Sequence, residues 1–194
     1  RRDRLVLVMQ SYTRIAGLMG WSVERGLRKL RYDFVDSLLL GYWNSPVPPR
    51  VVDAAMRLRE RGLVRHVGIS SHNRPFIASL LGDARFDTFH LRYNALHPGA
   101  EVDIFPYVPK ENRPGLVAFT ATSWKQLLDP KRTPAGERVP TAMDCYRFVM
   151  SNPAVDVCMS GPANMAQMGE ALDALRLGPM TVEELAWMRR LGGR

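Results

Sequence analysis

Apolar side chains gather in six short stretches along the chain, and most of these stretches are nearly continuous rather than alternating with polar residues. Strands that are covered on both faces of a parallel sheet have this composition. We therefore predict six parallel strands. The predicted strands cover residues 5–9, 34–40, 65–70, 86–91, 116–120 and 155–160.

Helix signals fill the intervals between these strands. Thr181 and Glu184 have the spacing of a capping box, while Pro48 and Pro49 open a helix that Gly62 ends. The predicted helices cover residues 22–30, 48–62, 73–82, 141–152, 163–175 and 181–188, with Ser22, Asn73 and Thr141 as further N-capping residues.

The alternation of strand and helix predicts a parallel α/β architecture. Two arrangements fit it, an open doubly wound sheet and a (β/α)8 TIM barrel, and periodicity does not choose between them. A complete eight-unit barrel takes roughly 250 residues. Six units in 194 residues have the same number of residues per unit, so the length fits a barrel that is two units short.

The composition is that of one globular domain, because 46% of the 194 residues are hydrophobic. The chain has neither a leader nor an apolar run long enough to span a membrane, so we expect a cytoplasmic protein with no membrane partner. Its two cysteines, Cys145 and Cys158, are expected to be small buried hydrophobic residues in a reducing compartment. No metal is predicted, because no set of His, Cys and carboxylate residues has metal-ligand spacing.

The net charge of +8 raises the question of an anionic partner. The arginines are dispersed along the chain, as with Arg57 and Arg61 on one predicted helix face. No basic tract is interleaved with aromatic residues. We therefore expect no nucleic-acid partner.

In either architecture, ligands bind beyond the carboxyl ends of the strands. The residues that follow the six strands are rich in hydroxyls, amides and aromatic rings, and residues 160–162 lead into a helix whose N-terminus suits a phosphate. The chain has no Walker loop, no G-x-G-x-x-G and no G-x-S-x-G motif. A dinucleotide site of the Rossmann type therefore lacks its main signature.

Three polar residues within or next to strands leave two interpretations open. Asp36 is either a structural charge with partners or a site residue, because a buried carboxylate needs partners. His90 is either a core histidine bonded to backbone or a ligand contact. His72, beside the capping Asn73, is a loop residue or a general acid and base.

Several motifs together resemble the aldo-keto reductases, which are NADP(H)-dependent (β/α)8 barrel enzymes. Residues 31–40, RYDFVDSLLL, resemble the family pattern L-x-x-D-Y-I/V-D-L-x-L-L-H, and residues 62–71, GLVRHVGISS, are similar to G-K-I/V-R-x-I/V-G-V-S-N. Residues 117–120 are similar to the start of V-x-A-Y-S-P-L. Residues 160–170 are similar to the final P-G-x-x-x-x-x-Q-x-x-E-N. The order of these motifs matches that of the family over nearly the whole chain.

This resemblance implies a TIM barrel of aldo-keto reductase type, here about six β/α units from the third strand to the C-terminal helices. Residues 1–194 would then form a single domain that lacks the first two units, which carry the family's catalytic Asp and Tyr. An open barrel exposes a strand edge and apolar surface. We expect such a chain to aggregate, to self-associate through this edge, or to need a partner that closes it.

The two remaining catalytic positions of the family depart from its pattern. The family Lys falls on Gln10 and the family His on Gly41. Hydride transfer to a carbonyl builds negative charge on oxygen, which the family Tyr protonates while the Lys lowers the pKa of that Tyr. Gln10 carries no charge and Gly41 has no side chain, so the catalytic residues stay unknown.

The positions that bind the cofactor in the family are retained better than the catalytic positions. The resemblance places Ser70, Ser71 and His90 at the nicotinamide amide and Phe119 on the nicotinamide ring. Ala171 replaces an Asn at the adenine, and the last motif has no Arg or Lys for a 2′-phosphate, so NADP and NAD both stay open. The other implied positions are Thr120 and Thr122 at the pyrophosphate, Gly161, Asn164, Gln167 and Glu170 at the adenosine, and Tyr42, Trp43 and Trp124 at the substrate mouth.

Two functions follow from the resemblance. The first is an NAD(P)H-dependent oxidoreductase that reduces small aldehydes or ketones. The second is a catalytically inactive relative that binds a nucleotide or a partner protein through the same face. The substitutions at Gln10 and Gly41 favour the second function, whereas the retained cofactor positions fit both.

Overall fold

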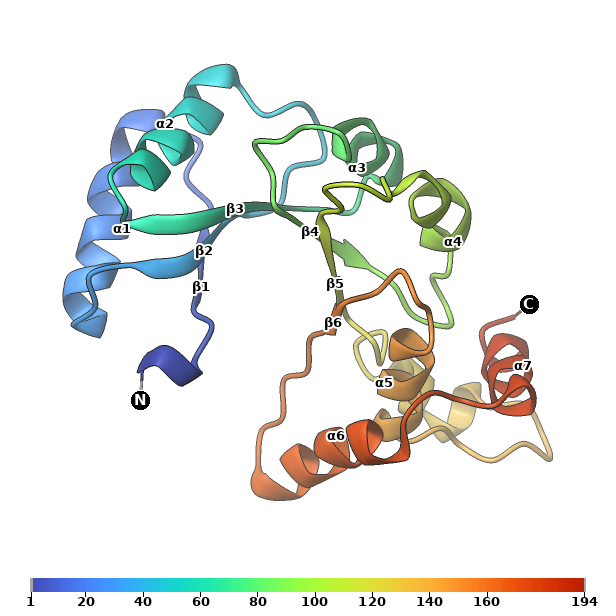
Figure 1. The fold of residues 1–194 in the computed structure, drawn as a ribbon. Helices are drawn as coiled ribbons and strands as arrows, with labels where there is room; N and C mark the ends of the chain where they lie inside the picture. Colours follow the sequence, from blue (N-terminus) through green and yellow to red (C-terminus); the bar gives the residue numbers. More distant parts are fainter. Residues whose placement is uncertain (1, 194) are drawn as a thin grey trace. The chain divides into compact units, whose positions relative to one another are not determined.

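The structure, a computed structural model, describes residues 2–193. Within this range strands and helices alternate along the chain (Figure 1). The strands follow one another in chain order across a sheet, and the pairs β1–β2, β2–β3 and β5–β6 are parallel. They are β1 (Val8–Ser11), β2 (Val35–Leu40), β3 (Val64–Ser71), β4 (Thr88–Arg92), β5 (Gly115–Phe119) and β6 (Val157–Cys158).

The helices follow the strands as the sequence predicted, with one short addition, α4. None of the helices in the described range combines the length and the apolar character that a membrane-spanning helix needs. The α-helices are α1 (Ala16–Leu30), α2 (Pro49–Glu60), α3 (Arg74–Leu80), α4 (Ala100–Asp103), α5 (Ala142–Met150), α6 (Met165–Leu177) and α7 (Val182–Leu191). Short 3-10 helices are η1 (Arg2–Arg4), η2 (Phe105–Tyr107), η3 (Gln126–Leu128) and η4 (Pro130–Arg132).

The described chain divides into two compact units. The first unit contains residues up to 90 together with 107–114, and the second contains 91–106 together with the residues from 115 onward. In the first unit, α1 and α2 pack against each other and against strands β1 to β3 (Figure 1). Val35, Leu38 and Val67, on β2 and β3, are fully buried.

Helix α1 begins six residues earlier than predicted. The expected N-cap, Ser22, lies inside the helix, which starts at Ala16 after an Ile15 that makes no side-chain cap. Gly17 and Gly20 have low helix propensity, so the sequence does not predict a helix over this first turn. The helix forms there because Met19 is fully buried and continues the apolar face of the later turns.

Asp36 on β2 is a structural charge with several partners. Its Oδ2 atom accepts hydrogen bonds from the backbone N–H of Leu7 (2.8 Å) and from Nη2 of Arg2 (2.7 Å). Nη1 of Arg65 lies 3.2 Å from Oδ1. The Leu7 hydrogen bond and the two guanidinium groups lower the pKa of Asp36 below its ordinary value, although burial opposes them. Of the two interpretations, the structural one is correct.

In the second unit, α5 packs on α6 and on β6 (Figure 1). The predicted caps at Thr141 and Thr181 are confirmed, and each forms a capping box with the acidic residue three positions later. Strand β6 has only two residues instead of the predicted six. At its start the Asp156 side chain accepts from the backbone N–H of Leu116 (2.7 Å). Both cysteines are free. Cys145 is buried as expected, whereas the expectation of burial is wrong for the partly exposed Cys158.

Candidate functional site

A pocket of about 240 Å³ lies in the second unit, where β5 ends and α6 begins. We call it the β5–α6 pocket. It contains five of the residues that the family motifs assigned to a cofactor, contributed by two segments about forty residues apart in the chain. The lining residues are Thr120, Ala121, Thr122, Lys125, Leu128, Ala142, Tyr146, Met159, Gly161, Pro162, Gln167 and Glu170.

The loop after β5 forms one wall of this pocket with an unusual backbone. Four of its non-glycine residues have positive φ, namely Thr120 (58°), Ser123 (49°), Trp124 (52°) and Lys125 (68°). Such conformations are uncommon outside glycine and persist where the surroundings hold them. Here the carbonyl of Thr120 accepts from Asn94 Nδ2 and from the backbone N–H of Ser123, both at 2.8 Å. These bonds fold the loop back on itself and place Lys125 on the pocket.

Two of the predicted site residues are engaged in capping α6. Asn164 Oδ1 accepts from the backbone N–H of Gln167 (3.0 Å), and Gln167 Oε1 accepts from the backbone N–H of Ala163 (2.8 Å). Gln167 lines the pocket, but Asn164 is not among the lining residues. Part of the family-like motif at this helix start therefore caps the helix.

Glu170 connects α6 to the beginning of α5. Its Oε1 atom accepts a hydrogen bond from the backbone N–H of Met143, the second residue of α5, at 3.2 Å. A carboxylate at a helix N-terminus is favoured by the unpaired N–H groups there. The bond fixes the carboxylate at the edge of the pocket and leaves its second oxygen for a ligand.

Lys125 is a pocket residue that the sequence analysis missed. It is the only Lys or Arg among the lining residues. Its ammonium has no hydrogen bond or ion pair with any residue in the described range. Tyr146 and Met159 were missed as well, and burial raises the pKa of Tyr146 above its ordinary value. The only sequence signal for Lys125 was its position five residues after the predicted strand 116–120.

In the first unit, Ser70 and Ser71 are both buried at the end of β3. Ser70 Oγ accepts from the backbone N–H of Tyr42 (2.9 Å). Ser71 Oγ donates to Asn44 Oδ1 (3.0 Å) and accepts from the backbone N–H of Asn73 (2.9 Å). Both hydroxyls thus hold the 41–44 loop and the start of α3.

The three residues expected at a substrate mouth differ in accessibility. In the first unit Tyr42 is half exposed and its ring meets the edge of His72 at a centroid distance of 5.1 Å. Trp43 is only 7% exposed, and the Arg14 guanidinium lies 3.6 Å from its ring centroid. Trp124, in the second unit, is exposed. Tyr42 and Trp124 are therefore open to a ligand in their own units, whereas the Trp43 ring is covered.

Gly41 falls on the family His position, and other side chains fill the space beside it. A Cβ atom at Gly41 would lie 2.9 Å from Gln10 Nε2 and 2.9 Å from ring atoms of Tyr12. Gln10 and Tyr12 therefore occupy the region that a side chain at position 41 would enter. Tyr12 itself is 65% exposed.

His90 lies in the middle of β4, and Phe119 is the last residue of β5. His90 is buried, and its Nδ1 atom has no hydrogen-bond partner within the described range. Burial lowers the pKa of His90 to about 4, so the ring is neutral near pH 7. Phe119 is partly exposed, on the opposite side of β5 from the buried Leu116 and Ala118. Among residues 2–193, no group of three His, Cys, Asp or Glu side chains could hold a metal ion.

Comparisons with known proteins give a consistent result. The model of the aldo/keto reductase family matches residues 14–138, more than half of the chain. The holo form of an aldo-keto reductase from Bacillus halodurans is 20% identical, with 98% of this chain and 73% of that chain covered and a TM-score of 0.80. For an aldo/keto reductase from Klebsiella pneumoniae in complex with NADP and acetate, the identity is 24%, the coverage 98% and 71%, and the TM-score 0.81. A search of curated proteins gave no match.

These structural likenesses decide the fold class. Of the two architectures that periodicity left open, the chain has the one found in the barrels of these reductases. The predicted α/β class and the family resemblance are both confirmed.

Proposed function

Because the chain belongs to the aldo/keto reductase family, we propose that it is an oxidoreductase that uses NADP or NAD to reduce small aldehydes or ketones. The β5–α6 pocket is the observation that carries this proposal. Thr120, Thr122, Gly161, Gln167 and Glu170, all assigned to a cofactor from motifs, line this one cavity. A pocket that unites them in the folded chain supports a nucleotide site.

The size and chemistry of the pocket suit the adenosine end of a dinucleotide. Its volume of about 240 Å³ is below the roughly 300–1,000 Å³ of sites that enclose a whole ligand, so it would hold part of one. The free ammonium of Lys125 suits a phosphate. The open oxygen of Glu170 suits an exocyclic amine, and Tyr146 offers a ring beside it. Lys125 supplies the cation for a 2′-phosphate that the last sequence motif lacks.

When bound, a reduced nicotinamide cofactor supplies the hydride for a carbonyl. The chain must then stabilise and protonate the carbonyl oxygen. The Gln10 amide can donate a hydrogen bond to that oxygen but cannot protonate it. Tyr12, whose ring fills the space beside Gly41, carries the O–H group that we assign as proton donor.

A non-catalytic nucleotide-binding protein is the second candidate. It is favoured by the neutral Gln10 and by Gly41, which together remove the charge and the imidazole that activate carbonyl reduction in the family pattern. In this case the β5–α6 pocket would still bind the dinucleotide. Both candidate functions predict that the chain binds the dinucleotide, but only the first predicts turnover of a carbonyl substrate.

The binding experiment is a titration with NADPH and with NADH, followed by quenching of tryptophan fluorescence. We expect saturable binding at micromolar cofactor. If Lys125 pairs with the 2′-phosphate, Lys125→Gln should raise the Kd for NADPH about tenfold, or ~1.4 kcal/mol, with little change for NADH. Lys131→Gln removes an exposed charge outside the pocket and serves as the control. Absence of saturable binding in a sample shown by circular dichroism to be folded would overturn the proposal.

The activity experiment follows oxidation of the reduced cofactor with a panel of small aldehydes and ketones. We expect turnover that Tyr12→Phe abolishes while the Kd for NADPH stays unchanged. Turnover that survives Tyr12→Phe rejects Tyr12 as donor. Tight cofactor binding without turnover on any carbonyl identifies the second candidate.

A further inference from the structure

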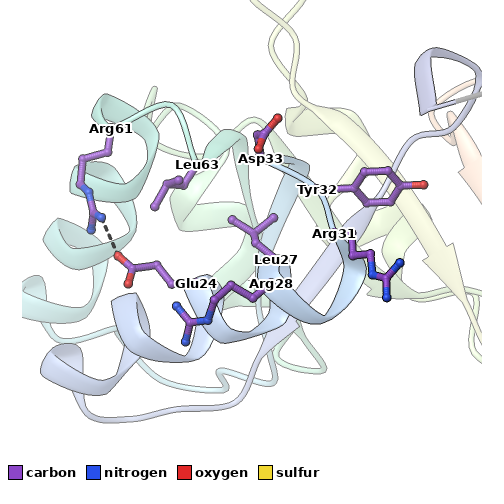
Figure 2. A pocket seen from close by; sticks show the side chains of 8 residues that line it. All are labelled: Glu24, Leu27, Arg28, Arg31, Tyr32, Asp33, Arg61 and Leu63. Atoms are coloured by element: carbon purple, nitrogen blue, oxygen red, sulfur yellow. Dashed lines mark hydrogen bonds and ion pairs between the residues drawn. The ribbon is translucent and has the colours of Figure 1, made fainter.

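A second groove lies in the first unit, at the amino ends of β2 and β3 (Figure 2). It has a volume of about 600 Å³. The last turns of α1, the connection to β2 and the turn between α2 and β3 form its walls. We call it the arginine groove, after Arg28, Arg31 and Arg61. Its other lining residues are Glu24, Leu27, Tyr32, Asp33 and Leu63.

The arginine groove is separate from the site described above. Parallel β/α proteins bind cofactors and substrates beyond the carboxyl ends of their strands, whereas the opposite face usually serves stability. Tyr32 and Leu63 precede β2 and β3, so the groove is on that opposite face. The proposed oxidoreductase function makes no use of it.

The cationic groups of the groove are only partly neutralised. Arg61 Nη2 lies 2.5 Å from Glu24 Oε1, and Figure 2 shows this pair together with Arg28 at one end of the groove. Arg31 lies at the other end with Tyr32. Neither the Arg28 nor the Arg31 guanidinium makes a hydrogen bond or ion pair with another residue of the range 2–193.

Helix capping does not account for these two guanidinium groups. Basic residues in a last helical turn often bond the free carbonyls there. In α1 the carbonyls of Leu27 and Arg28 are already satisfied by the backbone N–H groups of Tyr32 (3.2 Å) and Arg31 (3.3 Å). Arg31 also adopts the left-handed conformation (φ 56°), which glycine or asparagine usually takes at this position. Both guanidinium groups are therefore free for another partner.

We propose that the arginine groove binds the phosphate group of a small molecule. A guanidinium offers parallel N–H donors that match phosphate oxygens, and the Tyr32 hydroxyl adds a further donor. The buried Leu27 and the partly buried Leu63 give an apolar floor for the organic part of a phosphate ester.

Arginine footprinting tests this directly, because it reports each side chain separately. The full chain is treated with phenylglyoxal at constant ionic strength, with and without millimolar inorganic phosphate, pyrophosphate or phenyl phosphate, and modified arginines are located by peptide mass spectrometry. We expect protection of Arg28 and Arg31. Arg50 and Arg57, exposed on α2, are the internal controls and should stay reactive. Stronger protection by phenyl phosphate identifies a phosphate ester as the ligand, and equal protection by inorganic phosphate identifies the free anion.

A matched pair of variants supplies the second measurement. By isothermal titration, Arg28→Gln/Arg31→Gln should weaken phenyl phosphate binding at least tenfold, while Arg50→Gln/Arg57→Gln, with the same loss of charge, should change it less than twofold. Binding that persists in the first variant, or protection that is equal at all four arginines, would overturn the proposal. Lys125→Gln separates the two sites, since it should leave footprints at Arg28 and Arg31 unchanged whatever it does to NADPH binding.

Discussion

The guanidinium of Arg147 and the carboxylate of Glu184 form a two-bond ion pair, with Nη1–Oε1 at 2.6 Å and Nη2–Oε2 at 2.8 Å. Arg147 lies on α5 and is buried, and Glu184 lies in the first turn of α7. The same guanidinium donates to the carbonyls of Gly178 (3.0 Å) and Pro179 (3.1 Å), between α6 and α7. One side chain therefore ties three segments of the second unit together.

Replacement of Arg147 by Met should destabilise the protein by about 2–4 kcal/mol, because it removes the cation beside Glu184 and the donor to two carbonyls. Urea unfolding followed by circular dichroism measures the change. The control is Arg176→Met, which removes the exposed Arg176–Asp173 pair and should cost less than about 0.5 kcal/mol. Equal effects of the two variants would contradict the structural role given to Arg147.

The same ion pair predicts acid lability. The hydrogen bond from Arg147 lowers the pKa of Glu184 below its ordinary value. The pair therefore contributes stability above the ordinary pKa, near 4.5, and loses it as the pH falls through the lowered pKa. Below that range the stability difference between wild type and Arg147→Met should shrink to the part that comes from the Gly178 and Pro179 carbonyls. A stability difference that is independent of pH would argue against the ion pair.

The buried His90 predicts a second pH dependence of the protein's stability, at higher pH than that of Glu184. Its pKa is lowered by burial from 6.5 to about 4. Between these values the unfolded chain binds a proton that the folded chain does not, so stability is full above pH 6.5 and falls as the pH drops toward 4. His90→Gln should flatten this slope, by about 1 kcal/mol for each pH unit crossed. Urea unfolding of both proteins near neutral and at mildly acidic pH measures it, and parallel curves would contradict a buried neutral ring.

Gly68 on β3 is packed too closely for a side chain. A Cβ atom there would lie 3.1 Å from the backbone oxygen of Thr88 and would collide with Oγ1 of Thr88. Gly68→Ala should therefore cost about 1–3 kcal/mol, and Thr88→Ala in the same protein should recover part of it. Gly41→Ala is the control, because its new Cβ meets only the ends of the flexible Gln10 and Tyr12 side chains. Unfolding free energies that are equal for the two Ala variants would refute the steric argument.

The Cys145 thiol should react slowly with disulfide reagents in the folded protein. It is fully buried, and burial raises its pKa to about 12. At pH 8 only about one thiol in ten thousand would be ionised, and the thiolate is the reactive species. In a Cys158→Ser protein, reaction with a disulfide reagent should be orders of magnitude slower in the native than in the urea-unfolded state. Comparable rates would mean that Cys145 is accessible.

Much of the fold was predictable from the sequence because its signals are local. Asn73, Thr141 and Thr181 bond the first turns of their own helices, so a few neighbouring residues determine these helix starts. The apolar runs predicted the buried strands β2, β3 and β5 for the same reason. The early start of α1 was not predictable, since the burial of Met19 against distant residues outweighs the two glycines that precede and follow it.

For the candidate site, too, the locally determined features were predictable and those that depend on distant contacts were not. The sequence predicted which residues stand at the strand ends, Thr120 and Gly161 among them, and the motif resemblance added Glu170. Only the tertiary structure decided that the left-handed loop carries Lys125 onto the β5–α6 pocket and that Asn164 is engaged as a helix cap. The reason is physical: capping and strand patterns depend on neighbours in the chain, whereas a side chain's freedom to bind a ligand depends on which distant groups have already taken its hydrogen bonds.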